Sequence, residues 1–266
     1  MKRRDCLALM GASSLLLAGC AGVPAATGTG DLGVVVARST GTLAIVNTSQ
    51  RTLLAEVKGL GDLSHASVVF SRDGRYAFVF GRDGALTKVD LLTQRIAGRV
   101  MQAGNSIGGA ISADGRLVVA QNYTPGGIKA FDTTTLELVA DIPAEYEHGK
   151  LSRVVGLVDL PGRRFAYSLF DANAIWITDL SNPARPVTTK LPNIGKQPYD
   201  ALVTPNGRHY IAGLFGEDGL AMVDLWEDKP TVRRILGGYG RGQEPLPVYK
   251  MPHLRGWAVA GRHAYL

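Results

Sequence analysis

Short runs in which apolar and polar residues alternate recur along most of the chain, and turn residues separate them. The runs RYAFVFG at 75–81 and RLVVAQ at 116–121 have a period of two, which is typical of β-strands. Asp-Gly and Asn-Gly steps between such runs favour the positive φ at which a tight hairpin reverses. No ten-residue stretch after residue 30 has a helical period, so the pattern predicts an all-β protein.

The turns repeat at a regular spacing. The run SRDGR at 71–75 returns in related form three times, and its glycines are 41, 47 and 45 residues apart, at Gly74, Gly115, Gly162 and Gly207. Four short strands in roughly 40 to 45 residues form one propeller blade, so we predict a β-propeller. The repeated Asp-Gly-Arg is interpreted as structural: the aspartate caps the turn, the glycine permits it, and the arginine lies solvated at its edge.

The length of the chain bounds the number of blades. Residues 31–266 hold about five blades of roughly 45 residues, and the final run GWAVAGRHAYL has the pattern of two more strands. An open propeller leaves strand edges unpaired. We therefore expect five to six blades in 31–266, incomplete at the C-terminus, as part of a larger, closed ring.

The N-terminus has the pattern of an export signal. A charged start, MKRRD, precedes an apolar run too short to span a bilayer, which ends in Leu-Ala-Gly-Cys at Cys20. This predicts a lipoprotein signal peptide at 1–19, a lipid on the Cys20 sulfur, and a flexible tether at 20–30. The mature protein would be periplasmic and membrane-anchored. A plain secretory signal with a chance cysteine is the alternative, and RRDCL leaves Sec and twin-arginine export open.

Charge and cysteine content exclude several functions. The net charge is +6, but the basic residues form no tract, which argues against a nucleic-acid partner. Cys6 falls in the predicted signal and Cys20 is the other cysteine, so no disulfide, thiolate metal site or CxxCH for covalent haem is expected. The chain also contains no GxSxG, P-loop or HExxH motif.

Propellers bind ligands at the mouth of the central channel, on residues that recur in position but differ in type between blades. His65, Tyr199 and His253 occupy such positions before successive strands. Two imidazoles and a phenol could ligate an iron or donate to its distal ligand. The alternative is that the histidines are loop residues bonded to nearby carbonyls.

Three arginines lie at related positions. Arg38 and Arg82 each precede a turn between paired strands, and Arg153 begins a strand after the turn EYEHGKLS. Guanidinium groups that converge on a channel could bind carboxylates in bidentate fashion. The alternative is an ordinary turn arginine that pairs with a neighbouring aspartate such as Asp83.

Several segments resemble a known family. The runs VVVARSTGTLAIVN and QNYTPGGIKAFD, and the His65 segment with GRYAFVFGRDGALTKVDL, resemble the heme d1 propeller of cytochrome-type nitrite reductases. The chain is more similar to the heme d1 biosynthesis proteins of denitrifying bacteria in three features. These are the lipobox, which is the Leu-Ala-Gly-Cys run ending at Cys20, the lack of a c-haem domain, and the run KMPHLRGWAVAGRHAYL. The resemblance covers nearly all of the expected mature chain, and it implies a propeller that has eight blades in the full-length family.

The resemblance implies roles for individual residues. His65 matches the proximal ligand of the heme iron, although it lies one residue farther from GRY than in the nitrite reductases. His253 matches one distal histidine, and Tyr199 stands where the other would be, which makes both catalytic candidates. Arg38 and Arg82 match arginines that hold the heme carboxylates. Pocket residues are matched by Arg153 and Tyr123.

The function implied is maturation of heme d1. The protein would bind a late precursor of the dihydro-heme d1 type and convert it or deliver it to nitrite reductase, with other maturation proteins as partners. Dehydrogenation of a propionate side chain to an acrylate would make it an oxidoreductase. Nitrite reduction is disfavoured by the missing CxxCH. The remaining alternative is a non-haem propeller lipoprotein: a protein-binding scaffold, or a lactonase-like hydrolase with metal ligands from Asn105, Asn122 and Asp200.

Overall fold

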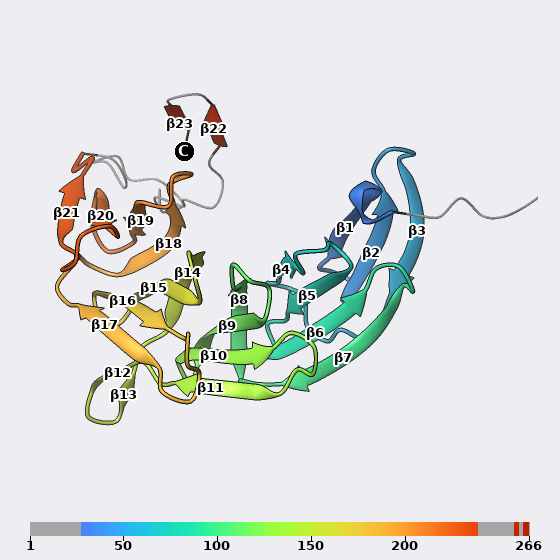
Figure 1. Cartoon of the computed structure of the whole chain (residues 1–266), viewed down its shortest axis with the longest axis horizontal. Helices are drawn as coiled ribbons and strands as arrows, with labels where there is room; N and C mark the ends of the chain where they lie inside the picture. The colour runs from blue at the N-terminus through green and yellow to red at the C-terminus, as the bar shows by residue number, and fades with distance from the viewer. Residues whose placement is uncertain (1–27, 239–257, 261–262, 266) are drawn as a thin grey trace, which may run out of the picture.

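The computed structural model describes residues 28–238, 258–260 and 263–265. Apart from one 3-10 turn, η1 (Thr29–Asp31), the regular elements in these residues are all strands. They form successive antiparallel sheets arranged along an open arc (Figure 1). The all-β propeller class predicted from the sequence is confirmed.

Each sheet is one blade whose strands follow the chain order. Blade 1 consists of β1 (Leu32–Ala37), β2 (Thr42–Asn47) and β3 (Thr52–Val57). Blade 2 consists of β4 (Ser67–Phe70), β5 (Tyr76–Phe80), β6 (Ala85–Asp90) and β7 (Arg95–Met101). Blade 3 consists of β8 (Asn105–Ile111), β9 (Leu117–Thr124), β10 (Gly127–Asp132) and β11 (Leu138–Ile142).

The chain continues into two further blades. Blade 4 consists of β14 (Val154–Leu160), β15 (Arg164–Leu169), β16 (Ala174–Asp179) and β17 (Val187–Leu191). Blade 5 consists of β18 (Pro198–Val203), β19 (His209–Leu214), β20 (Leu220–Asp224) and β21 (Val232–Ile235). Small hairpins are formed by β12 (Glu145–Glu147) with β13 (Lys150–Leu151), and by β22 (Ala258–Ala260) with β23 (His263–Tyr265).

The first strands of blades 2 to 5 lie on the inner side of the arc (Figure 1). Strand β4 contacts β8, β8 contacts β14, and β14 contacts β18. Because the strands of a blade are antiparallel, the turn between its second and third strands and the connection that enters its first strand lie at the same end. We call this the connection end, and it is where the candidate residues lie.

The core lies between neighbouring blades rather than within one. Alternate residues of each strand point to opposite faces of the sheet. Blades 2 to 4 therefore pack apolar side chains against both neighbours, and blades 1 and 5 against the one described neighbour. Between blades 4 and 5, for example, Ala166 and Ile177 pack with Ala212 and Val223. The buried Tyr210 hydroxyl also donates to the Gly156 carbonyl at 2.9 Å and contacts the Ser168 hydroxyl. The blades therefore form one continuous packed structure.

The repeated Asp-Gly-Arg turn is structural, as predicted, but its arginine is not simply solvated. Asp73 accepts hydrogen bonds from the Ser71 hydroxyl and the Arg75 amide, at 2.5 and 3.1 Å. The Arg75 guanidinium donates to the Asp90 carboxylate at 2.7 Å. Asp90 belongs to the next turn at that end of the blade. Arg208 and Asp224 form the same pair in blade 5 at 2.6 Å. The Arg75 and Arg208 side chains stay 43% and 46% exposed, so they are solvated as predicted, but each also forms an ion pair that was not predicted because the two turns lie side by side.

The turn aspartate Asp114 makes the stability of the protein sensitive to acid. Burial opposes its ionisation, but hydrogen bonds from Ser112 and Arg163 outweigh burial and lower its pKa from 3.8 to about 2. A carboxyl whose pKa is lower in the folded state stabilises the protein above its unfolded pKa and loses this contribution as the pH falls. We expect Asp114→Asn to destabilise the protein at pH 7 and to reduce the loss of stability between pH 4 and pH 2.

Urea unfolding at a series of pH values measures this effect. The exposed aspartate Asp228 provides the control, because Asp228→Asn removes the same charge outside the contacts of Asp114. Parallel profiles for wild type and Asp114→Asn would show that the contacts of Asp114 carry no net stability.

Candidate functional site

The candidate residues occupy equivalent positions where successive inner strands begin. His65 lies two residues before β4, Arg153 immediately precedes β14, and Tyr199 is the second residue of β18. Asn105 is the first residue of β8. Because these inner strands contact one another in order, the four residues lie along one rim at the connection end. We call these four residues the inner rim.

Backbone hydrogen bonds tie each turn of the connection end to the segment entering the inner strand. The Arg82 amide donates to the Asp62 carbonyl at 2.8 Å, and the Phe170 amide donates to the Arg153 carbonyl at 3.0 Å. In blade 5 the Phe215 amide donates to the Gln197 carbonyl at 2.9 Å. The turns therefore surround the inner rim and are fixed to it.

Two tyrosines from different blades meet at this end. The hydroxyls of Tyr123, on β9, and Tyr199, on β18, are 2.7 Å apart. The Tyr199 ring also lies 5.8 Å from the Phe170 ring and 5.6 Å from the Phe215 ring, between centroids. Burial, and then the hydrogen bond with Tyr199, raise the pKa of Tyr123 well above its ordinary value. Tyr123 is therefore a protonated phenol at neutral pH.

Arg153 lies beside the same aromatic rings. Its guanidinium is 4.2 Å from the centroid of Phe170. It also bonds Asp171 through Nε and Nη2, at 3.0 and 2.5 Å. This hydrogen bond to Asp171 raises the pKa of Arg153. Of the two interpretations of these arginines, pairing with an aspartate therefore applies to Arg153, while its side chain stays 44% exposed to solvent.

Arg38 and Arg82 differ from Arg153. Both are exposed, and within residues 28–238 neither side chain forms a hydrogen bond or an ion pair. Asp83, the partner suggested by the sequence, instead bonds Arg99 at 2.9 Å and caps its own turn through the Ala85 amide at 3.1 Å. The pairing of Arg82 with Asp83 is therefore not seen, and the acidic group within electrostatic reach of Arg82 is Asp62. Both guanidinium groups remain exposed.

The segment that carries His65 adjoins the turns of both arginines. A Cβ on Gly41, in the turn after Arg38, would lie only 2.8 Å from the Gly61 carbonyl oxygen. The Ser64 amide donates to the Asp62 carboxylate at 2.8 Å, which orders the residues immediately before His65. His65 is half-buried. The segment that carries His65 is thus held against the turns of Arg38 and Arg82.

Polar atoms are buried near the start of the inner strands. Ser67 Oγ and Asn105 Oδ1 are buried and have no hydrogen-bond partner among the described residues. Leaving such an atom unsatisfied costs about 1–3 kcal/mol, so it commonly marks a place where a ligand or water binds. Ser67 and Asn105 begin β4 and β8, so these atoms fit a polar ligand at the inner rim.

Two of the residues considered for a lactonase-like metal site, Asn122 and Asp200, are buried. The buried Asn122 side chain exchanges two hydrogen bonds with the Gln102 amide, both of 2.9 Å. Its oxygen is therefore engaged. Asp200 is buried on β18 and is 7% exposed. Among the described residues, no three histidine, cysteine or acidic side chains are grouped so that they could hold a metal ion.

Two predicted residues, His253 and Cys20, lie outside the described residues, and their roles stay predictions. The same is true of the lipid anchor. None of the helices in the described part of the chain is long and apolar enough to cross a membrane.

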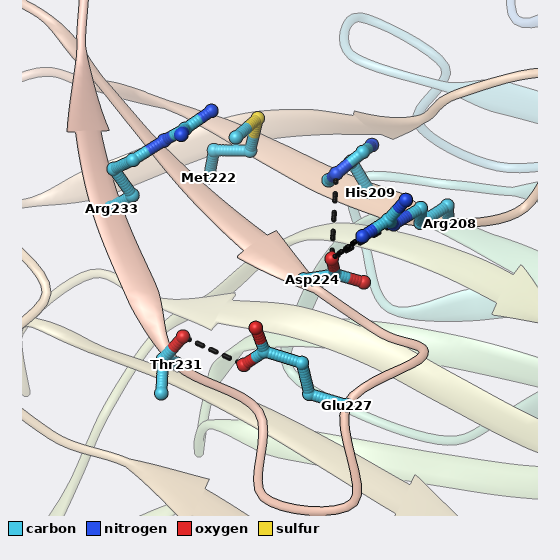
Figure 2. A pocket seen from close by; sticks show the side chains of 7 residues that line it. All are labelled: Arg208, His209, Met222, Asp224, Glu227, Thr231 and Arg233. Carbon is cyan, nitrogen blue, oxygen red and sulfur yellow. Dashed lines mark hydrogen bonds and ion pairs between the residues drawn. The ribbon is translucent and has the colours of Figure 1, made fainter.

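A pocket at the opposite end of blade 5 is a different feature (Figure 2). Its volume is about 330 Å³. The residues that line it are Arg208, His209, Met222, Asp224, Glu227, Thr231 and Arg233. The equivalent surface of blade 2 faces blade 3, where Lys88 Nζ donates to the Thr133 and Thr134 carbonyls at 2.8 and 3.1 Å. This pocket is therefore a groove on the face with which a blade packs against the next blade, and it lies at the opposite end of the blade from the inner rim.

Sequence reasoning missed Asp171, Phe170 and Phe215, which complete the site around Arg153 and Tyr199. A signal was present, because FDAN at 170–173 and FGEDG at 215–219 stand where blade 2 has GRDG at 81–84. Reading these turns as equivalent would have placed Asp171 at the position of Arg82. An aspartate at this position predicts an ion pair with an arginine at the connection end.

The fold and this arrangement of residues define a class of protein. The Cytochrome D1 heme domain family model matches residues 27–265, so the chain belongs to this family. The resemblance to heme d1 propellers, first drawn from short segments, is thereby confirmed.

Relatives within the family are more specific. "Protein NirF" of Pseudomonas aeruginosa is 62% identical over 253 residues, which are 94% of this chain and 64% of that protein. "Protein NirF" of Stutzerimonas stutzeri is 61% identical over the same shares. The similarity to NirF, to which the lipobox and the C-terminal run pointed, is confirmed. The chain spans about two thirds of the length of these relatives.

A second group of relatives includes a solved complex. The "Dihydro-heme d1 dehydrogenase" of Pseudomonas aeruginosa is 29% identical over 205 residues, which are 76% of this chain and 39% of that protein. The structure "Dihydro-heme d1 dehydrogenase NirN in complex with DHE" matches with a TM-score of 0.70 and 26% identity, over 83% of this chain and 47% of the other. Kuenenia stuttgartiensis Hydrazine Synthase, with a TM-score of 0.58 and 16% identity over 74% of this chain and 62% of the other, shares the fold.

Proposed function

We propose that this protein binds a late heme d1 precursor of the dihydro-heme d1 type at the inner rim. The observation that carries the proposal is that the segment entering His65 adjoins the turns of the exposed Arg38 and Arg82, on a chain of the Cytochrome D1 heme domain family. An iron tetrapyrrole with carboxylate side chains needs a nitrogen ligand for its metal and cations for its edge.

The residues divide between these tasks. His65 is proposed to ligate the iron through an imidazole nitrogen. Arg38 and Arg82 bind carboxylates, and the exposed side of Arg153 contributes a further cation. Tyr123 and Tyr199 present two phenol hydroxyls joined by a hydrogen bond of 2.7 Å, while the Phe170 and Phe215 rings pack against the Tyr199 ring.

The fate of the bound precursor follows from the same residues. We propose that the protein takes part in its conversion or in its delivery to nitrite reductase. Conversion would be dehydrogenation of a propionate to an acrylate, with Tyr199 and His253 as proton-handling residues. The side chain would lose two protons and two electrons, so this activity requires an external electron acceptor.

The cellular setting is also a proposal. Cleavage before Cys20 and lipidation of its sulfur would hold the propeller at a membrane facing the periplasm. Nitrite reductase and other heme d1 maturation proteins are then the expected protein partners. Labelling with a radioactive fatty acid tests the anchor, since Cys20→Ser should remove the label.

Titration with ferric heme d1 tests the binding proposal. We expect the Soret band to shift and to saturate at one equivalent, whereas ferric protoporphyrin should bind at least tenfold more weakly because its carboxylates differ in number and placement. An unchanged spectrum together with calcium binding would contradict the proposal and favour a lactonase-like propeller. Incubation with the dihydro precursor and an artificial electron acceptor separates conversion from carriage.

A further inference from the structure

The connection that leads into Tyr199, residues 192–197, is held by blade 4. The Ile194 amide donates to the Asn173 carbonyl at 3.1 Å, and the Gln197 amide donates to Asn173 Oδ1 at 2.8 Å. Asn173 thus bonds both ends of a short segment through its main chain and its side chain. It lies in the turn that also carries Phe170, one of the rings against Tyr199.

Blade 5 holds the same connection from the other side. Glu217 Oε1 accepts hydrogen bonds from the Lys196 amide and from Arg234 Nη1, both of 2.7 Å. The Phe215 amide donates to the Gln197 carbonyl at 2.9 Å. Glu217 lies in the turn that carries Phe215, the second ring against Tyr199.

The backbone of this connection adopts conformations that it would not take unaided. Asn193 and Gln197 have φ values of 57° and 50°, and Asn173 has φ of 52°. Residues other than glycine rarely adopt such left-handed values, which persist when the surrounding structure imposes them. The hydrogen bonds that Asn173 and Glu217 accept impose these values here, because the Gln197 amide donates to Asn173 and the Lys196 amide donates to Glu217.

We propose that Asn173 and Glu217 are positioning residues for Tyr199. They act through the strained connection and hold the Tyr199 phenol within hydrogen-bonding distance of Tyr123, which comes from a blade two places away. Their turns also bring the Phe170 and Phe215 rings against Tyr199, so one pair of turns sets both the backbone and the ring. The value of this arrangement for ligand binding rests on the proposed function, but the positioning itself does not.

Asn173 offers a sharp test because its equivalents in two other blades are glycines. Gly84 and Gly219 stand at its position with φ values of 84° and 98°. Asn173→Gly therefore keeps a backbone that accepts left-handed φ and removes only the side-chain acceptor. Asn173→Asp keeps an acceptor oxygen and should restore the hydrogen bond. The control is Asn182→Gly, which removes a turn acceptor, bonded to the Ala184 amide at 3.2 Å, at the opposite end of blade 4.

The measurement is the ¹⁹F NMR spectrum of the whole chain with 3-fluorotyrosine at position 199. We expect one resonance in wild type, a shifted or doubled resonance in Asn173→Gly, and a wild-type spectrum in Asn173→Asp and Asn182→Gly. Glu217→Gln, a milder change that retains an acceptor, should move the resonance in the same direction by less. A wild-type spectrum in folded Asn173→Gly, or no rescue by aspartate, would overturn the inference.

Ligand titration of the same variants separates this inference from the proposed function. If the inner rim binds ferric heme d1, Asn173→Gly should weaken binding about fivefold, which corresponds to the net contribution of one hydrogen bond. Asn173→Asp should restore the wild-type affinity. If wild type binds no heme d1, the proposed function fails, while the ¹⁹F spectra still decide whether Asn173 positions Tyr199.

Discussion

Replacement of His65 by alanine is expected to abolish the shift of the Soret band that ferric heme d1 undergoes on binding. An iron–imidazole bond is the contact that changes the electronic spectrum of the ligand most directly. His65 is half-buried at the inner rim, next to the turns of Arg38 and Arg82. Without its imidazole, the carboxylate contacts remain, so we expect at least a tenfold weaker affinity and a spectrum close to that of the unbound ligand.

Two further variants make this result specific. His65→Gly should regain the bound spectrum when imidazole is added to the solution, because the small molecule can occupy the space left by the side chain. His148→Ala, which changes an exposed histidine of the β12–β13 hairpin, should behave as wild type. If heme d1 binds equally well to His65→Ala, the assignment of the iron ligand is wrong.

The double variant Arg38→Gln/Arg82→Gln is expected to weaken heme d1 binding by at least tenfold while leaving the Soret position of the bound form unchanged. A charge-assisted hydrogen bond contributes about 1.5–3 kcal/mol, and exposure of both side chains to water reduces this value. Affinity should also become less sensitive to salt, because fewer ion pairs form on binding. Absorbance titrations at two salt concentrations measure both effects.

A control of equal charge separates local contacts from net charge. Arg95→Gln/Arg116→Gln removes two exposed arginines near the opposite end of blades 2 and 3. This variant should bind heme d1 as wild type does. Equal losses in the two double variants would mean that the general positive charge of the protein, rather than Arg38 and Arg82, attracts the ligand.

The fold could be predicted from the sequence because its evidence is local and repeated. Strands of period two, glycines at positive φ and a spacing of about 45 residues together specify blades before any long-range contact is known. Even so, the sequence does not predict that Arg75, at the exposed edge of its turn, also forms an ion pair with Asp90. A single blade repeat shows which turns recur but not which of them touch at the blade end.

The site could be predicted only in part. Position in the repeat was enough to nominate His65, Arg38, Arg82 and Tyr199. It did not predict that the Tyr123 and Tyr199 hydroxyls would meet, because 76 residues separate them in sequence. That contact depends on the angle between blades 3 and 5, which the packing of blade 4 sets. Partners of charged residues are equally non-local in this fold, as the pairing of Asp83 with Arg99 instead of Arg82 illustrates.

A crystal structure of the protein with ferric heme d1 tests the central claim most directly. The account predicts one ligand at the inner rim, with its iron bonded to His65, carboxylates bonded to Arg38 and Arg82, and an edge in contact with Tyr199. A ligand bound elsewhere, such as the groove of Figure 2, with the inner rim unoccupied, would contradict it.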